Sequence, residues 1–81
     1  MTPAAWKEEV ERALSGAGAP WRVRDAWQEL PSGMLCADLS DTRSGKWCEI
    51  RLASDRFSTV AARRAEIVRQ AAKWRRRQPG G

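Results

Sequence analysis

Basic side chains crowd the end of the sequence, and their type and spacing are the clearest chemical signal in the chain. Residues 58–81 contain six arginines and one lysine against the single acid Glu66, while the whole chain of 81 residues has a net charge of +5. Guanidinium and ammonium groups donate hydrogen bonds to phosphate oxygens, and phosphate contacts dominate the affinity of proteins for nucleic acids. This segregation of charge predicts a surface that binds a polyanion.

The last helix, predicted from about Ser58 to Arg77, has two unlike faces. Helical spacing puts Val60, Ile67, Ala71 and Trp74, together with Ala61, Ala65, Val68 and Ala72, on one half of its circumference. We expect this apolar half to pack on the core and the basic half to face solvent. The helix residues predicted to contact nucleic acid or a partner are Arg63, Arg69, Lys73, Arg76 and Arg77.

A second interpretation of the same cations is a solvated helix end. Cations near the C-terminal end of a helix interact favourably with its dipole, by about 0.3–1 kcal/mol each. That effect would account for Lys73 and residues 75–77, but not for Arg63, Arg64 and Arg69 in the first and middle turns. We therefore favour the binding of a polyanion or of an acidic partner.

The chain has few residues that are suited to catalysis. The sequence has no histidine and no tyrosine, so the commonest general base is missing. The acids are scattered, and Cys36 and Cys48 without histidine do not make a metal site. We expect a protein that is not an enzyme and has no cofactor.

The elements that position these residues follow from periodicity and end signals. A short helix is predicted within residues 2–18, capped by Thr2, with Pro3 in its first turn. Its apolar stripe is Trp6, Val10, Ala13 and Leu14. Three alternating segments, residues 21–30, 34–39 and 47–52, then predict strands joined by polar turns.

The alternation also predicts which strand residues face the core. Trp21, Val23 and Trp27 share one face of the first strand. Pairing Leu30 with Met34 across the turn would add Leu35, Ala37 and Leu39 to that face. Cys48 then points inward and Cys36 outward, so the two thiols do not bridge, whereas a slip of one residue would put both on one face.

These elements predict a two-layer α+β domain: a helix, a three-stranded antiparallel sheet and a second helix, with both helices on one sheet face. Residues 1–78 would form this single domain, and residues 79–81 a disordered tail. Charged residues near the start leave no room for a signal peptide, and no apolar run approaches the ~20 residues of a membrane span. We expect a cytoplasmic protein without membrane contact.

The passage from Asp41 to Glu66, "DTRSGKWCEIRLASDRFSTVAARRAE", is similar to the arm-type (AP2-like) DNA-binding domain of tyrosine recombinases. In that family three antiparallel strands precede a helix that often opens with an aromatic residue, any residue and threonine. Phe57, Ser58 and Thr59 match this opening. The order of elements also resembles a double-stranded RNA-binding domain, although the glycines that precede the last helix of that family are absent.

The first resemblance implies that the open sheet face contacts DNA in the major groove. Carried onto this sequence, it implies that Arg22, Arg24, Arg51 and Trp47 make the contacts. Asp38 and Glu49 fall on the same predicted face, and the positive excess lies on the helix instead.

In its size and lack of catalytic motifs the chain also looks like a small phage anti-CRISPR protein. Such inhibitors act by occupying the surfaces of nucleoprotein complexes. On this hypothesis Leu30, Met34 and Trp47 would form an apolar patch on the open sheet face. Together with the basic residues of the last helix, this patch would bind a host CRISPR-Cas effector complex and block its nucleic-acid binding. A homodimer through that face is a further alternative.

Overall fold

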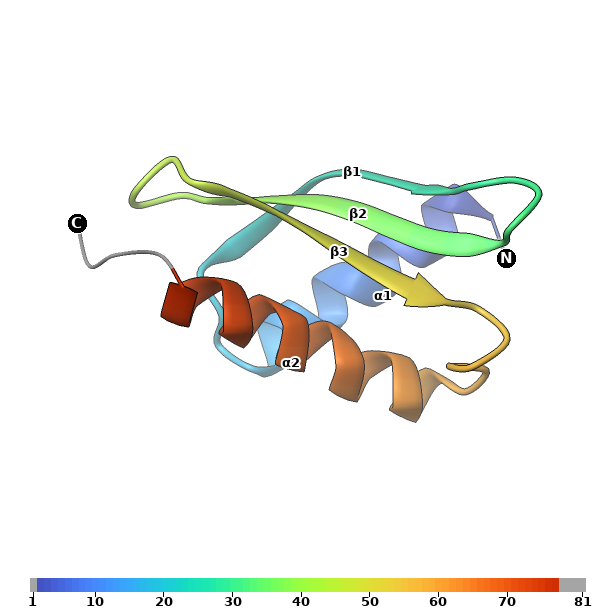
Figure 1. Ribbon diagram of the computed structural model, residues 1–81. Helices are drawn as coiled ribbons and strands as arrows, with labels where there is room; N and C mark the ends of the chain where they lie inside the picture. Colours follow the sequence, from blue (N-terminus) through green and yellow to red (C-terminus); the bar gives the residue numbers. More distant parts are fainter. Residues whose placement is uncertain (1, 78–81) are drawn as a thin grey trace.

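The computed structural model describes residues 2–77, with the backbone alone for residues 75–77. It confirms the predicted order α1 (Pro3–Gly16), β1 (Trp21–Gln28), β2 (Met34–Asp41), β3 (Trp47–Ala53) and α2 (Val60–Arg77). The strands are antiparallel with β2 in the centre, and both helices lie beneath one sheet face while the other stays open (Figure 1). The tail predicted at residues 79–81 lies outside the described residues.

A threonine caps the start of each helix: Thr2 as predicted at α1, and Thr59 at α2, which begins at Val60 and not at about Ser58. The Thr2 hydroxyl accepts a hydrogen bond from the Ala5 amide at 3.1 Å, and Pro3 opens α1. At α2 the Thr59 hydroxyl accepts from the Ala62 amide, also at 3.1 Å. Within the described part of the chain, neither helix combines the length and apolar character that a bilayer span needs.

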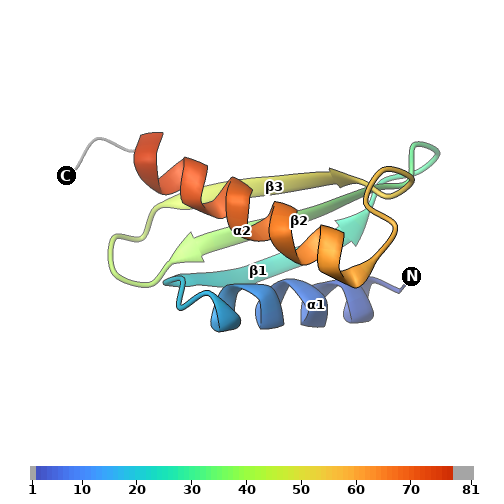
Figure 2. The ribbon, with the colours of Figure 1, turned by 90° about the horizontal axis from the view of Figure 1, so that it is seen from below.

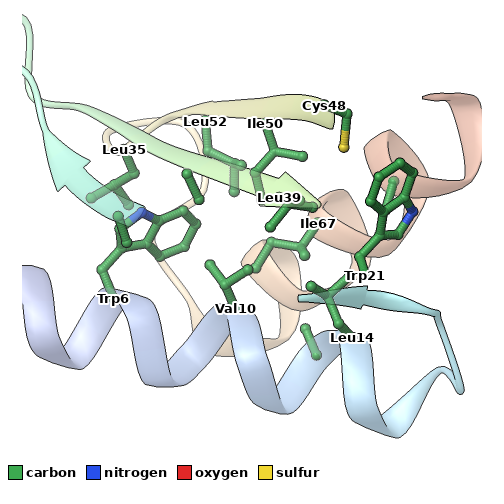
Figure 3. Packing of buried hydrophobic residues seen from close by; sticks show 14 residues of the cluster. Trp6, Val10, Leu14, Trp21, Leu35, Leu39, Cys48, Ile50, Leu52 and Ile67 are labelled. Carbon is green, nitrogen blue, oxygen red and sulfur yellow. The ribbon is translucent and has the colours of Figure 1, made fainter. Parts of the chain in front are cut away.

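The hydrophobic core fills the space between the sheet and the two helices (Figure 3). Alternate residues of β2 and β3 point into it, as predicted, and so does the apolar stripe of α1. The Trp6 indole packs among them and donates its Nε1 hydrogen to the Cys36 carbonyl oxygen at 2.8 Å, which ties α1 to the central strand. The largest fully buried side chains include Trp6, Val10, Leu14, Leu35, Leu39, Ile50, Leu52 and Ile67.

Strand β1 departs from the prediction after Val23. Its pairing with β2 shifts there because Arg24 is an extra residue in the ladder, a β-bulge. The alternation is therefore reversed beyond it: Ala26 is buried in the core, and Trp27 lies opposite Cys36 on the open face. The prediction that Trp27 faces the core is wrong.

The turn between β1 and β2 is also displaced by one residue. The Glu29 amide, and not that of Leu30, donates to the Met34 carbonyl oxygen at 2.8 Å. Leu30 consequently lies in the turn itself, where its side chain is 85% exposed. Gly33 closes the turn with a φ of 76°, a left-handed conformation that favours glycine.

The two cysteines are free thiols on opposite faces of the sheet, as predicted. Cys48 belongs to the core cluster, whereas Cys36 is buried on the other side, where its thiol donates to Glu29 Oε1 across 3.6 Å. Burial, with a smaller contribution from Glu29, raises the pKa of Cys36 to about 11. Burial and the nearby Asp38 raise the pKa of Cys48 to about 12.

Candidate nucleic-acid interface

Arg63, the first predicted contact on α2, is buried. Its Nε donates to Glu9 Oε1 of α1 at 2.6 Å, and its Nη1 donates to the Phe57 carbonyl oxygen at 3.2 Å. The two charged side chains are only 11% and 14% exposed. A guanidinium held in this way joins the helices and cannot meet an external phosphate. The prediction that Arg63 lies on the solvent face is therefore wrong.

Arg69 and Lys73 lie one turn apart on the exposed side of α2, which we call the outer flank. Arg69 donates through Nε and Nη2 to both carboxylate oxygens of Glu66, at 2.7 and 2.6 Å, yet its side chain remains 61% exposed. These hydrogen bonds lower the pKa of Glu66 and raise the pKa of Arg69. No ion pair among the described side chains involves Lys73.

Two of the predicted contacts, Arg76 and Arg77, belong to the backbone of α2. Their side chains lie outside the described part of the structure.

Gln70 and Trp74 hold α2 against the outer edge of β3. The Gln70 amide accepts from the Arg51 backbone N–H at 3.0 Å and donates to the Arg51 carbonyl oxygen at 2.8 Å. The Trp74 Nε1 hydrogen is donated to the Glu49 carbonyl oxygen at 3.2 Å. These side chains supply hydrogen bonds that a further strand would otherwise supply, so α2 protects this edge.

The helix is consequently rotated about its axis relative to the predicted orientation. Ala61, Ala65 and Ala72, predicted to be packed, are exposed, while Arg63 and Gln70 turn inward. A methyl group contributes little apolar area on burial, and the observed orientation gives hydrogen-bond partners to the Arg63 guanidinium and to the Arg51 backbone groups of β3. The predicted separation into two faces holds only in part.

The rotation creates a depression that sequence reasoning missed. It measures about 280 Å³ and is lined by Arg69, Gln70, Lys73 and Trp74. Trp74 was expected on the packed half of the helix, but its side chain is 39% exposed. The signal in the sequence is the spacing of Glu66, Gln70 and Trp74, which stacks three hydrogen-bonding side chains in one row.

On the open sheet face, three of the four predicted contact residues already contact other side chains of the sheet or of the turn next to it. The Arg24 guanidinium reaches across β2 and lies 4.0 Å from the centre of the Trp47 ring. Arg51 pairs with Glu29 at 2.9 Å and with Glu49 at 3.3 Å. These carboxylates, Glu29 first, raise the pKa of Arg51.

The open face as a whole is not positive. Its basic residues are Arg22, Arg24 and Arg51, and its acidic residues are Asp25, Glu29, Asp38 and Glu49. Within the described residues, no group of three or more His, Cys, Asp or Glu side chains is arranged to hold a metal ion. The open sheet face therefore has nearly balanced charges, whereas the outer flank of α2 has two cations, Arg69 and Lys73, and one acid, Glu66, among the described side chains.

The predicted apolar patch of Leu30, Met34 and Trp47 is not contiguous. Met34 pairs with Ala53 at one end of β2, whereas Trp47 pairs with Ser40 near the other end. At about 3.3 Å per strand residue, roughly 20 Å separate the two ends. The expectation of one shared apolar surface is wrong, because it assumed neighbours that the register places apart.

No family model matches this chain, and comparisons with the curated proteins and with the solved structures gave no match. The fold and the site define the protein as an α+β domain with an open three-stranded sheet and with cations on the outer flank of α2.

Proposed function

We propose that this protein binds nucleic acid through the outer flank of α2. The observation that carries the proposal is the unequal distribution of charge over the two surfaces. Four carboxylates outnumber the three arginines of the open sheet face. On the outer flank of α2, the cations Arg69 and Lys73 are accompanied only by Glu66 among the described side chains, whereas Arg64 lines a depression beside Glu8 and Glu9 of α1.

The outer flank also has suitable hydrogen-bonding chemistry for phosphate. Glu66 uses the Nε and Nη2 groups of Arg69 and leaves both Nη1 hydrogens available, so the guanidinium is oriented but not saturated. Lys73, one turn further on, adds an exposed ammonium group. Because both residues belong to a helix that is hydrogen-bonded to β3, binding should require little ordering of their backbone.

The salt dependence of binding tests this proposal. Affinity for a duplex should fall with a slope of about 0.9 log units per log unit of salt for each neutralised phosphate, and for a single strand about 0.7. Lys73→Ala should reduce the slope by about one phosphate contact. Lys7→Ala removes the same charge from the exposed surface of α1 and should leave the slope unchanged. A salt-independent affinity, or equal effects of both variants, would contradict the proposal.

The alternative of an anti-CRISPR-type inhibitor relied on an apolar patch shared by Leu30, Met34 and Trp47. Met34 and Trp47 lie near opposite ends of the sheet, so the structure does not form the apolar patch on which that hypothesis depended. The hypothesis itself stays a prediction. The same holds for a homodimer through the open face.

A further inference from the structure

We propose that Trp74 is a stacking platform for an unpaired nucleobase, so that the outer flank of α2 prefers single-stranded nucleic acid to duplex. The inference rests on the proposed function and narrows its ligand.

The Trp74 ring is held in one position before any ligand arrives. Its Nε1 hydrogen is bound to the Glu49 carbonyl oxygen at 3.2 Å. One turn earlier, the two hydrogen bonds of Gln70 to Arg51 fix the helix to the same strand. A large indole that served only to cover the strand edge would be expected to bury more of its surface, whereas 39% of this side chain remains exposed.

Cations stand beside the exposed indole. Arg69 and Lys73 line the same depression as Trp74, so a nucleotide on the ring would have its phosphate close to two positive charges. Aromatic rings with neighbouring cations are the elements by which proteins hold single strands without reading their sequence. In a duplex the bases already stack on one another and are not available to the ring.

Trp47 provides an internal contrast, because it is the more exposed of the two indoles, at 53%. The Arg24 guanidinium already occupies one side of its ring at 4.0 Å. Exposure alone therefore does not make a tryptophan a base platform.

The test compares Trp74→Leu, Trp74→Phe and Trp47→Leu for binding to an oligothymidylate and to a mixed-sequence duplex of equal length. Leucine keeps apolar cover over the strand edge but has no ring, whereas phenylalanine keeps a ring without the N–H group. Urea unfolding of each variant establishes that it is folded. Tryptophan fluorescence of the wild type and of Trp74→Phe gives a second measurement that does not depend on affinity.

Trp74→Leu should weaken single-strand binding about 10-fold or more, while Trp74→Phe and Trp47→Leu should stay within about threefold of the wild type. Duplex affinity should change little in all three variants. Oligothymidylate should quench the fluorescence of the wild type more strongly than that of Trp74→Phe. If Trp74→Leu binds the single strand as tightly as the wild type, with the salt slope intact, the platform is wrong and the proposed function stands. If the wild type binds neither nucleic acid, both fail.

Discussion

Arg63 of α2 and Glu9 of α1 form an ion pair with 2.6 Å between Nε and Oε1, in a position almost closed to solvent. Glu9 lies near the middle of α1 and Arg63 in the first turn of α2. The two helices are close together at their N-terminal ends and diverge toward their C-terminal ends (Figure 2). Because the Arg63 guanidinium also binds the Phe57 carbonyl oxygen, it joins α1, α2 and the loop before α2. A residue that looked like a phosphate contact is thus part of the structural framework.

Removing one partner should be costly. Glu9→Ala leaves a nearly buried guanidinium without its counterion, and we expect the free energy of unfolding to fall by about 3 kcal/mol. Urea denaturation measures this change. Arg12→Ala is the matched control, because it breaks the exposed pair with Glu8 and should cost about 0.5 kcal/mol or less. Equal losses in the two variants would show that the Arg63–Glu9 pair is not sealed as described.

The hydrogen bonds between Gln70 and β3 lead to a second prediction. Gln70→Ala removes both hydrogen bonds to the Arg51 backbone, and we expect a loss of about 1–2 kcal/mol in unfolding free energy. The variant also uncovers part of a strand edge, which can then pair with another molecule. Light scattering should detect more self-association in this variant than in the wild type. An entirely monomeric variant of wild-type stability would mean that this edge needs no cover.

Local signals in the sequence predict much of this fold. The cap at Thr2, the order of the elements and the inward faces of β2 and β3 depend on neighbouring residues and simple periods. The bulge at Arg24 does not, because strict alternation contains no sign of one extra residue. The error placed Trp27 in the core and shifted the turn that follows.

The orientation of α2 was unpredictable for a different reason. Apolar content favoured burial of its alanines, but Arg63 turns inward to meet Glu9, a residue 54 positions away. No window along the helix contains that partner. The sequence therefore predicted the candidate site only in part. Arg69 and Lys73 are exposed as expected. The exposure of Trp74 was not predicted, because it depends on the hydrogen bond of this residue to β3.

Two alanines of α2 test this orientation directly. Ala71 is buried at the interface with the core, and Ala65 is exposed six residues earlier. Ala71→Leu should overpack the interface and cost about 1–3 kcal/mol, whereas Ala65→Leu should stay within about 0.5 kcal/mol of the wild type. Thermal or urea unfolding distinguishes the two outcomes. The sequence-based prediction placed both alanines on the packed half of the helix, so similar losses in the two variants would contradict the orientation described here.

The buried thiols predict that stability decreases in alkaline solution. The native state holds its cysteine protons up to a pKa of about 11 for Cys36 and about 12 for Cys48, whereas an unfolded chain releases them near 9.0. Above pH 9 the unfolded state therefore binds fewer protons, so the free energy of unfolding falls as pH rises from about 9 to 11. Urea unfolding at pH 8 and pH 10 measures the decrease, which should be smaller in a Cys36→Ala/Cys48→Ala variant.

The burial of the two thiols also predicts their reactivity: iodoacetamide should modify the native thiols slowly at pH 8 and the urea-unfolded ones rapidly. Rapid modification of the native protein would show that the two thiols are not protected by the sheet.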